Sequence, residues 1–222
     1  MPIHRTKNEN FFKKWSPKMA YVLGYTCADG ALTVGKRGNK FLDFTSVDES
    51  LIQTVRATLD SNHKINRKTR KENWRPAYRL QIGSKTMFDD LGKLGLTTKK
   101  AKRLVYPDVP KKYFADFVRG YFDGDGHVSH GAYKRKGGNG VKQVLLSGLT
   151  SSTKSFLEKL RNDLTKLGIV SGGTLYYKKG HRLTFSINDS FGLYEFLYKN
   201  AGYGLYLQRK KRVFEKFFRM RA

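Results

Sequence analysis

The apolar positions of the chain follow two different periods, and the same succession of periods occurs twice. A helical spacing is found at Leu51, Val55 and Leu59, and again at Phe156, Leu160 and Leu164. Each of these patterns is followed by two strand-like segments, at residues 62–69 and 74–83 in the first half and at 173–179 and 181–188 in the second. The pattern predicts, in each half, a helix, two strands, a helix, two strands and a closing helix, which is an α+β fold.

The last strand-like segment of each half alternates between polar and apolar side chains. The polar positions are Arg75, Arg79 and Gln81 in the first half, and Arg182, Thr184 and Ser186 in the second. A period of two puts these side chains on one face of a sheet and the apolar ones on the other. A basic face on an antiparallel sheet suits a major groove of DNA.

A ten-residue segment at the start of each half has the same pattern. Residues 21–30 (YVLGYTCADG) and 117–126 (FVRGYFDGDG) both consist of an aromatic residue, Val, any residue, Gly, Tyr, two further residues, a small residue, Asp and Gly. The two Asp-Gly pairs lie 96 positions apart. We therefore expect two repeats, residues 1–106 and 107–222, with a boundary near Tyr106–Pro107.

Local signals predict that both motifs lie on helices, over 17–29 and 111–125. Ser16 followed by Pro17 is typical of a helix start, and Pro110 is expected to start the second helix in the same way. Gly30 and Gly126 are expected to end the two helices in the left-handed conformation.

Small residues recur at a spacing of four in both helices, at Gly24 and Ala28 and at Gly120 and Gly124. Residues four apart share one face of a helix, so these faces allow two backbones to approach closely. If the helices pack through these faces, their C-terminal ends meet and bring Asp29 and Asp125 together. Two carboxylates at helix C-termini repel each other unless a divalent cation offsets their charge, and Mg²⁺ suits such a site.

The net charge of the chain indicates an anionic partner. The 222 residues carry 44 Lys and Arg against 18 Asp and Glu, a net charge of +26, and residues 1–106 and 107–222 each hold 22 basic and 9 acidic side chains. Two equally basic halves favour two similar modules on one polyanion. No apolar run is long enough for a membrane span, and Cys27 is the single cysteine. We expect an intracellular globular protein without a membrane partner, in the cytoplasm or nucleoid by default or in an organelle.

The two ten-residue motifs resemble the signature of the LAGLIDADG homing endonucleases, and the two halves resemble the repeats of the single-chain members. The resemblance implies two αββαββα repeats related by a pseudo-twofold axis in a monomer, a central two-helix interface, and antiparallel sheets that form a saddle over DNA. One departure from equal repeats is Cys27, which stands where the second motif has Asp123. This difference suggests unequal halves and an asymmetric target.

The resemblance also implies the site residues. Asp29 and Asp125 would bind the catalytic metal, Mg²⁺ or Mn²⁺, and the carbonyls of Ala28 and Gly124 would assist; Ca²⁺ would occupy the site without supporting cleavage. Basic residues near the end of each repeat, matched by Lys100 and Lys210, would organise the reacting water. Polar strand residues would lie nearby, for which the candidates are Thr45 and Thr150.

The expected activity is hydrolysis of both strands of a specific duplex, leaving short 3′ overhangs. The chain begins with Met1 and lacks a C-terminal His-Asn pair, so we expect a free-standing, intron-encoded enzyme. The candidate DNA-binding residues are Lys36, Arg37, Lys40, Lys64, Asn66, Lys68, Arg70, Arg75, Arg79, Gln81, Lys134, Arg135, Lys142, Tyr176, Lys178, Arg182 and Ser186.

Other interpretations compete with this one. A non-cleaving RNA-binding maturase or a DNA-binding regulator on the same scaffold would have the same basic surface. The segment Asp123–Gly126 hints at a calcium loop, but His127 and Val128 stand where such a loop needs an oxygen ligand and Gly. His127 and His130 have no counterpart pair in the first half, so they are expected to lie on the surface or to face DNA. Cys27 is expected to be a small buried residue.

Overall fold

The computed structural model describes residues 5–69, 75–98, 104–134 and 140–221. The chain divides into two compact units, residues 1–124 and 125–222. Among the described residues, no helix is both long enough and apolar enough to cross a lipid bilayer.

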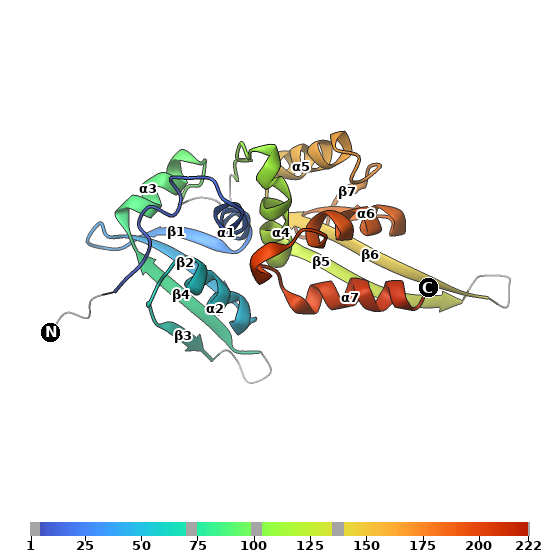
Figure 1. Cartoon of the computed structure of the whole chain (residues 1–222), viewed down its shortest axis with the longest axis horizontal. Coiled ribbons are helices and arrows are strands. Elements are labelled where there is room, and N and C mark those ends of the chain that lie inside the picture. Colours follow the sequence, from blue (N-terminus) through green and yellow to red (C-terminus); the bar gives the residue numbers. More distant parts are fainter. Residues whose placement is uncertain (1–4, 70–74, 99–103, 135–139, 222) are drawn as a thin grey trace. The chain divides into compact units, whose positions relative to one another are not determined.

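The first unit contains one four-stranded antiparallel sheet with helices on one face (Figure 1). Its elements are α1 (Pro17–Ala28), β1 (Gly30–Val34), β2 (Lys40–Ser46), α2 (Glu49–Thr58), β3 (Ile65–Lys68), β4 (Ala77–Gly83) and α3 (Lys85–Lys93). The strand order is β1-β2-β4-β3. Helices α2 and α3 pack on β2 and β4, and they bury Phe44 and Leu80 completely. The alternation of β2 and β4 therefore puts their polar side chains on the opposite face, here called the open face of the first sheet.

The second repeat has the same sheet topology, and two α-helices follow its last strand. Its elements are a 3₁₀ turn (Lys111–Tyr113), α4 (Phe114–Asp125), β5 (Gly126–Lys134), β6 (Val141–Ser151), α5 (Lys154–Lys166), β7 (Thr174–Tyr177), β8 (His181–Phe185), α6 (Ile187–Tyr198), a second 3₁₀ turn (Gly202–Gly204) and α7 (Gln208–Arg219). The order β5-β6-β8-β7 matches that of the first sheet. Thr45 pairs with Arg79 in one sheet, and Thr150 pairs with Arg182 in the other. The α+β class and the duplicated order predicted from the sequence are confirmed.

The start of α1 was predicted correctly from the sequence, and the start of α4 was not. The Ser16 hydroxyl accepts a hydrogen bond of 3.1 Å from the Met19 N–H, and Pro17 is the first helical residue, as expected. Pro110 instead precedes the 3₁₀ turn, and α4 begins at Phe114. The second helix therefore starts a full turn later than the pattern predicted.

The two glycines that follow the motif helices play another part than expected. Neither Gly30 nor Gly126 has a positive φ, and each is the first residue of a strand. A Cβ on Gly30 would lie 2.7 Å from the Cα of Thr26. At Gly30 the chain needs glycine because the first strand turns back closely against α1, and not because the backbone is left-handed.

The small faces of α1 and α4 are in direct backbone contact within the first unit. A Cβ on Gly24 would lie 2.0 Å from the carbonyl oxygen of Phe117, and one on Gly120 would lie 1.9 Å from that of Tyr21. Real Cβ atoms do not approach backbone atoms so closely, so neither position can hold a side chain without separating the helices. The packing predicted from the spacing of these glycines is confirmed, and it explains why α4 up to Gly124 clusters with α1.

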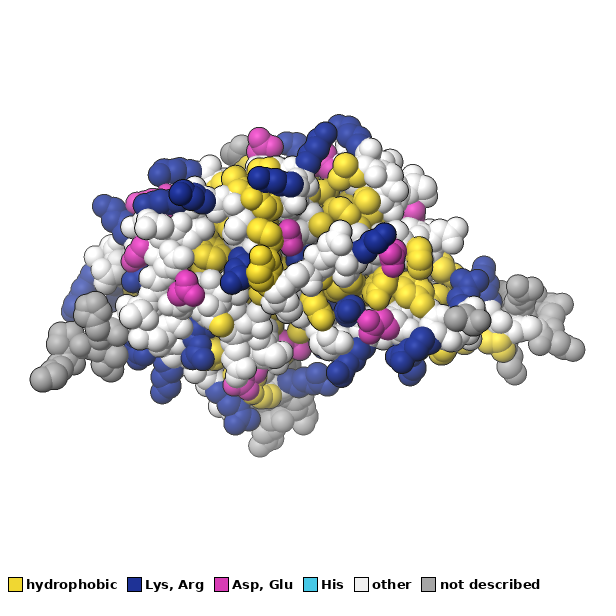
Figure 2. Space-filling view, viewed as in Figure 1, with side chains coloured by type: hydrophobic (Ala, Val, Ile, Leu, Met, Phe, Trp, Pro, Cys, Tyr) yellow, Lys and Arg dark blue, Asp and Glu magenta, His cyan; other side chains and the backbone are white. Residues whose placement is uncertain are grey.

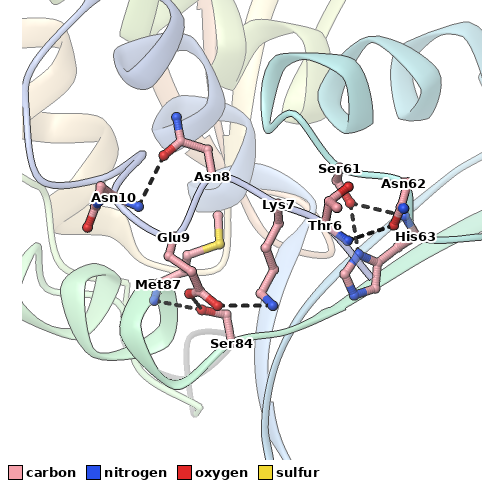
Figure 3. A network of polar contacts seen from close by, with 10 residues as sticks. All are labelled: Thr6, Lys7, Asn8, Glu9, Asn10, Ser61, Asn62, His63, Ser84 and Met87. Atoms are coloured by element: carbon pink, nitrogen blue, oxygen red, sulfur yellow. Dashed lines mark hydrogen bonds and ion pairs between the residues drawn. The ribbon is translucent and has the colours of Figure 1, made fainter. Parts of the chain in front are cut away.

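An N-terminal segment, residues 5–10, forms hydrogen bonds with the turn that follows α2 and with the start of α3 (Figure 3). The side-chain oxygen of Asn62 accepts a 2.8 Å hydrogen bond from the Thr6 N–H. Glu9 accepts a hydrogen bond from the Ser84 hydroxyl and pairs with Lys7 at 3.0 Å. Since Ser84 is also the N-cap of α3, the segment links the start of α3 to the turn that follows α2.

We expect Gly24→Ala to destabilise the first unit strongly. The new methyl group would meet the Phe117 carbonyl at 2.0 Å, and overpacking of this kind costs about 1–3 kcal/mol or more. The measurement is the free energy of unfolding from urea titration. Gly92→Ala is the control, because a Cβ there meets no atom within 4 Å and alanine favours the α3 helix. Equal unfolding free energies for wild type and Gly24→Ala would contradict the packing.

Candidate active site and nucleic-acid interface

The first half of the candidate site lies at the C-terminal end of α1. Asp29 is the C-cap of this helix, is exposed, and donates its backbone N–H to the Tyr25 carbonyl at 2.9 Å. The Tyr25 side chain is fully buried in the core, against the ring of Phe44. Burial, together with the negative charge of Asp29, raises the pKa of the Tyr25 hydroxyl well above its ordinary value.

The backbone of α4 lies against the end of α1 at Gly124, the residue before Asp125. A Cβ on Gly124 would lie 2.4 Å from the Cβ of Ala28 and 3.3 Å from Oδ2 of Asp29. The glycine therefore gives the Asp29 carboxylate access to the α4 backbone. In this way the small faces of the two helices put the Asp29 carboxylate beside the last turn of α4.

The second half of the site is built in the second unit around the end of α4. The Thr150 hydroxyl donates to the Asp125 carbonyl at 3.0 Å, and the Lys210 ammonium donates to the Gly126 carbonyl at 2.6 Å. Lys210 is only 4% exposed although it is a lysine. It lies in the first turn of α7, a helix that packs along β5. The structure thus puts two of the residues named from the sequence, Thr150 and Lys210, at the motif aspartate of their own repeat.

The corresponding residues of the first repeat are described only in part. Thr45 has the register of Thr150, opposite an arginine on the neighbouring strand. Lys100, the expected counterpart of Lys210, lies outside the described residues.

His127 is a member of the second half-site that was not assigned to it from the sequence. It follows Gly126 on β5 and pairs with Gly148 on β6, where a Cβ would lie 2.6 Å from the histidine ring. Burial, followed by the positive charges of Arg182 and Lys210, lowers the pKa of the His127 imidazole below its ordinary value. The signal that could have identified His127 is its position two residues after Asp125 at the start of a strand.

The motif position that holds a cysteine in the first repeat and an aspartate in the second is buried in both. Cys27 is 1% exposed, as expected for a small core residue, and Asp123 is 2% exposed. Asp123 accepts a 2.8 Å hydrogen bond from the Tyr21 hydroxyl of α1. Burial and the Asp123 charge raise the pKa of Tyr21 well above its ordinary value. Asp123 therefore joins α4 to α1 in the core and is not part of the candidate metal site.

The donor atoms at each helix end are of the kind that binds a hard divalent cation. They are the Asp29 and Asp125 carboxylates and the carbonyl oxygens at the C-terminal ends of α1 and α4, which are oxygen ligands without thiolate. Among the described residues, no group of three or more His, Cys, Asp and Glu side chains converges on one point. A cation at either helix end would depend on few carboxylates together with water and substrate oxygens, which is the coordination that Mg²⁺ accepts.

The open face of the first sheet holds a network of polar side chains centred on Asp43. Arg79 approaches the Asp43 carboxylate with Nη2 at 2.5 Å and Nε at 2.7 Å. Thr33 and Gln81 also donate hydrogen bonds to Asp43. Arg79 and Gln81 were predicted from the sequence as DNA contacts, but Asp43, the acidic residue that holds them, was not. The available signal was a charged residue between the apolar residues Leu42 and Phe44.

The other candidate DNA-binding residues lie mainly on exposed strands and turns. Exposed positions are found for Lys36, Arg37, Lys64, Asn66, Lys68, Arg75, Lys142, Tyr176 and Lys178. Arg182 is half-buried and donates to the Lys178 carbonyl at 3.2 Å. Arg70, Arg135 and the side chain of Lys134 lie outside the described residues. On the face shown in Figure 2, Lys and Arg side chains are present on both units.

Two of these candidates have other roles in the structure. Lys40 lies on the helix-covered side of β2, forms an ion pair with Asp89 of α3 and lies 4.9 Å from the centre of the Phe88 ring. Ser186 was expected to be a strand residue, but β8 ends at Phe185, and the Ser186 hydroxyl accepts the Asp189 N–H as the N-cap of α6. Helix capping ends the strand here, although the alternation of apolar residues continues to Ile187.

The chain is similar in sequence to short stretches of two archaeal proteins. It is 25% identical over 154 residues to the DNA-directed RNA polymerase subunit Rpo1C of Methanocaldococcus jannaschii, a match that covers 68% of this chain and 16% of that protein. It is 39% identical over 77 residues to the probable translation initiation factor IF-2 of Thermococcus kodakarensis, covering 33% of this chain and 6% of that protein. The chain therefore spans only a small part of the length of either relative.

Solved structures with the same fold cover almost the whole chain. The meganuclease I-SmaMI bound to uncleaveable DNA is 14% identical, with a TM-score of 0.63 over 92% of this chain and 90% of that chain. The I-LtrWI LAGLIDADG homing endonuclease bound to target DNA is 12% identical, with a TM-score of 0.64 over 96% of this chain and 90% of that chain. At these identities the likeness establishes the fold.

A family model matches the chain in two segments, residues 16–99 and 113–201, and its description is a LAGLIDADG-like domain. Each segment contains one motif helix and the four strands that follow it. Because the two segments make up most of the sequence and coincide with the two repeats of the fold, the chain belongs to the LAGLIDADG family as a two-repeat member.

Proposed function

We propose that this protein is a site-specific endonuclease that hydrolyses both strands of a duplex DNA with a divalent metal ion and leaves short 3′ overhangs. In this proposal one chain acts as a monomer, and each repeat contributes one half of the active site and one sheet to the DNA interface. Family membership and the DNA-bound state of the structural neighbours support DNA as the partner.

The backbone contact between α1 and α4 is the observation that carries the proposal. A structural core could join two helices through leucines, which would bury more apolar area. Here the contact is made at Gly24 and Gly120, and its C-terminal end brings Gly124 beside the Asp29 carboxylate. The C-terminal end of a helix is itself negative, so a cation bound beside the Asp29 carboxylate would interact favourably with both.

Asp29 and Asp125 would hold the metal ion, assisted by the carbonyl groups of Ala28 and Gly124. A divalent cation bound there would supply activation of a water molecule and stabilisation of the leaving oxygen. The protein's own contribution in the second repeat is positioning. Thr150 fixes the carbonyl of Asp125, and Lys210 fixes that of Gly126.

Lys210 has a second role in the proposal. Its buried ammonium brings a positive charge to the end of α4, where a scissile phosphate and the attacking water would lie. A cation held without solvent around it stabilises developing negative charge more strongly than an exposed one does.

We expect Asp29→Asn and Asp125→Asn each to abolish double-strand cleavage while DNA binding persists. The amide keeps the size of the side chain but removes the charge that holds the cation. Cleavage is measured on a duplex selected from a randomised library in Mg²⁺, and binding is measured in EDTA.

Asp108→Asn, a change at an exposed loop aspartate, is the control and should cut at the wild-type rate. Retained cleavage by both motif variants would refute the catalytic assignment. Wild-type binding without any cleavage in Mg²⁺ or Mn²⁺ would favour a non-cleaving protein.

Lys210→Met should slow the single-turnover cleavage rate by about a hundredfold and change the DNA dissociation constant much less. Methionine preserves the length and packing of the buried side chain but removes the ammonium group. The control is Lys211→Met at the next position of α7, where the native lysine pairs with Glu215 at 3.5 Å. If Lys210→Met instead weakened binding and left the cleavage rate intact, Lys210 would be a phosphate contact.

A further inference from the structure

The open face of the second sheet, the side of β5–β8 away from α5 and α6, differs in chemistry from that of the first. Alternation puts every second residue of β6 on this face. These residues are Lys142, Val144, Leu146, Gly148 and Thr150. The hairpin of β5 and β6 is drawn as two long strands in Figure 1. On its open face, Val144 and Leu146 lie between Lys142 and Thr150, which belongs to the candidate active site.

The intervening residues of β6 establish which face is covered. Leu145 and Leu149 are completely buried, and the hydroxyl of buried Ser147 lies 2.7 Å from that of Ser190 on α6. Leu146 is 51% exposed, and Val144 is half-buried. Leu146 is therefore not a core residue, and its side chain projects from the sheet on the side that the helices leave open.

The surroundings of Leu146 leave space above it. Ser129 is its partner on β5, and Gly131 is the partner of Val144. A Cβ built on Gly131 would meet no atom within 4 Å. Small neighbours on the adjacent strand keep this apolar position accessible to a flat surface such as the edge of a base pair.

The first sheet presents hydrogen-bonding groups at the position that corresponds to Gly148, whereas Phe41 has the register of Leu146. Asp43 of β2 has the register of Gly148 of β6, since each lies two residues before the threonine that pairs with an arginine. Asp43 orders Arg79 and Gln81 on its open face. Arginine and glutamine recognise guanine and adenine by paired hydrogen bonds, which Leu146 and Val144 cannot make.

The charge around Leu146 favours DNA over a protein as the occupant of this face. Lys142 is exposed on the same strand and face, and Arg182 and the exposed Lys178 lie on the neighbouring hairpin of β7 and β8. An apolar partner surface would leave these charges opposite uncharged groups, which is unfavourable. A major groove offers phosphates for the basic side chains and one apolar group, the C5-methyl of thymine, for leucine.

We propose that Leu146, supported by Val144, recognises the C5-methyl group of a thymine in the half-site bound by the second repeat, while the first repeat recognises its half-site through the hydrogen-bonding network of Asp43. This proposal rests on the proposed function, because it assigns the chemistry by which the same DNA interface selects its target. It makes the target asymmetric in the kind of contact as well as in sequence.

The experiment removes the methyl group without changing any hydrogen bond. A duplex selected from a randomised library is resynthesised with each thymine replaced in turn by deoxyuridine, and dissociation constants are measured in EDTA for wild type and Leu146→Ala. Wild type should bind one such duplex about fourfold more weakly, the effect of one buried methyl group. Leu146→Ala should not distinguish that duplex from the thymine duplex, so the two changes are coupled.

Leu167→Ala is the matched control, because Leu167 is 43% exposed in the same unit but lies at the end of α5 and in no strand. It should retain the wild-type loss on deoxyuridine. Equal effects of deoxyuridine on wild type and Leu146→Ala at every thymine, or no effect at any position, would overturn the proposal while sequence-specific binding remained. Failure of wild type to select any duplex would instead refute the proposed function itself, and the present proposal with it.

Discussion

The direct contact of the α1 and α4 backbones is the constraint on which the rest of the structure depends. Phe117 and Tyr21 present carbonyl oxygens where a Cβ on Gly24 or Gly120 would lie only about 2 Å away, so the helices approach as closely as backbones can. Close approach along the whole contact is what makes Gly124 a neighbour of Asp29. A single methyl group in the middle of the contact would move the helix ends apart, and in enzymes a misplacement of about 1 Å can cost about a hundredfold in rate.

Around this contact, buried polar groups fix each helix end. Asp123 and Tyr21 join the two helices inside the core. In the second unit, Thr150 and Lys210 hold the carbonyls at the end of α4 from two separate elements, a strand and a helix. A buried lysine that donates to a backbone carbonyl offsets part of its desolvation cost and leaves its charge at the helix end.

The two repeats share sheet topology and register, but the open faces of their sheets carry different polar side chains. In the first sheet, Asp43 draws Arg79 and Gln81 into one network. In the second, the equivalent position is Gly148, and the space is taken by the ring of His127. A glycine here leaves room for the ring of His127, whereas the aspartate orders the side chains of Arg79 and Gln81. Duplication therefore preserved the sheet frame, which depends on alternation, while the open faces diverged because no core packing constrains them.

The sequence by itself determined the duplication, the order of elements, the helix-packing face and the motif aspartates. These follow from local periodicity and from residue types that have few other uses, such as glycines four apart on a helix. Only the tertiary structure decided that Lys40 turns to Asp89 of α3 and that Ser186 caps α6. It also decided that Asp43, His127 and Leu146 belong to the open faces. Those assignments depend on which residues the strand register places opposite each other and which face the helices cover, and neither is encoded in the alternation of a single strand.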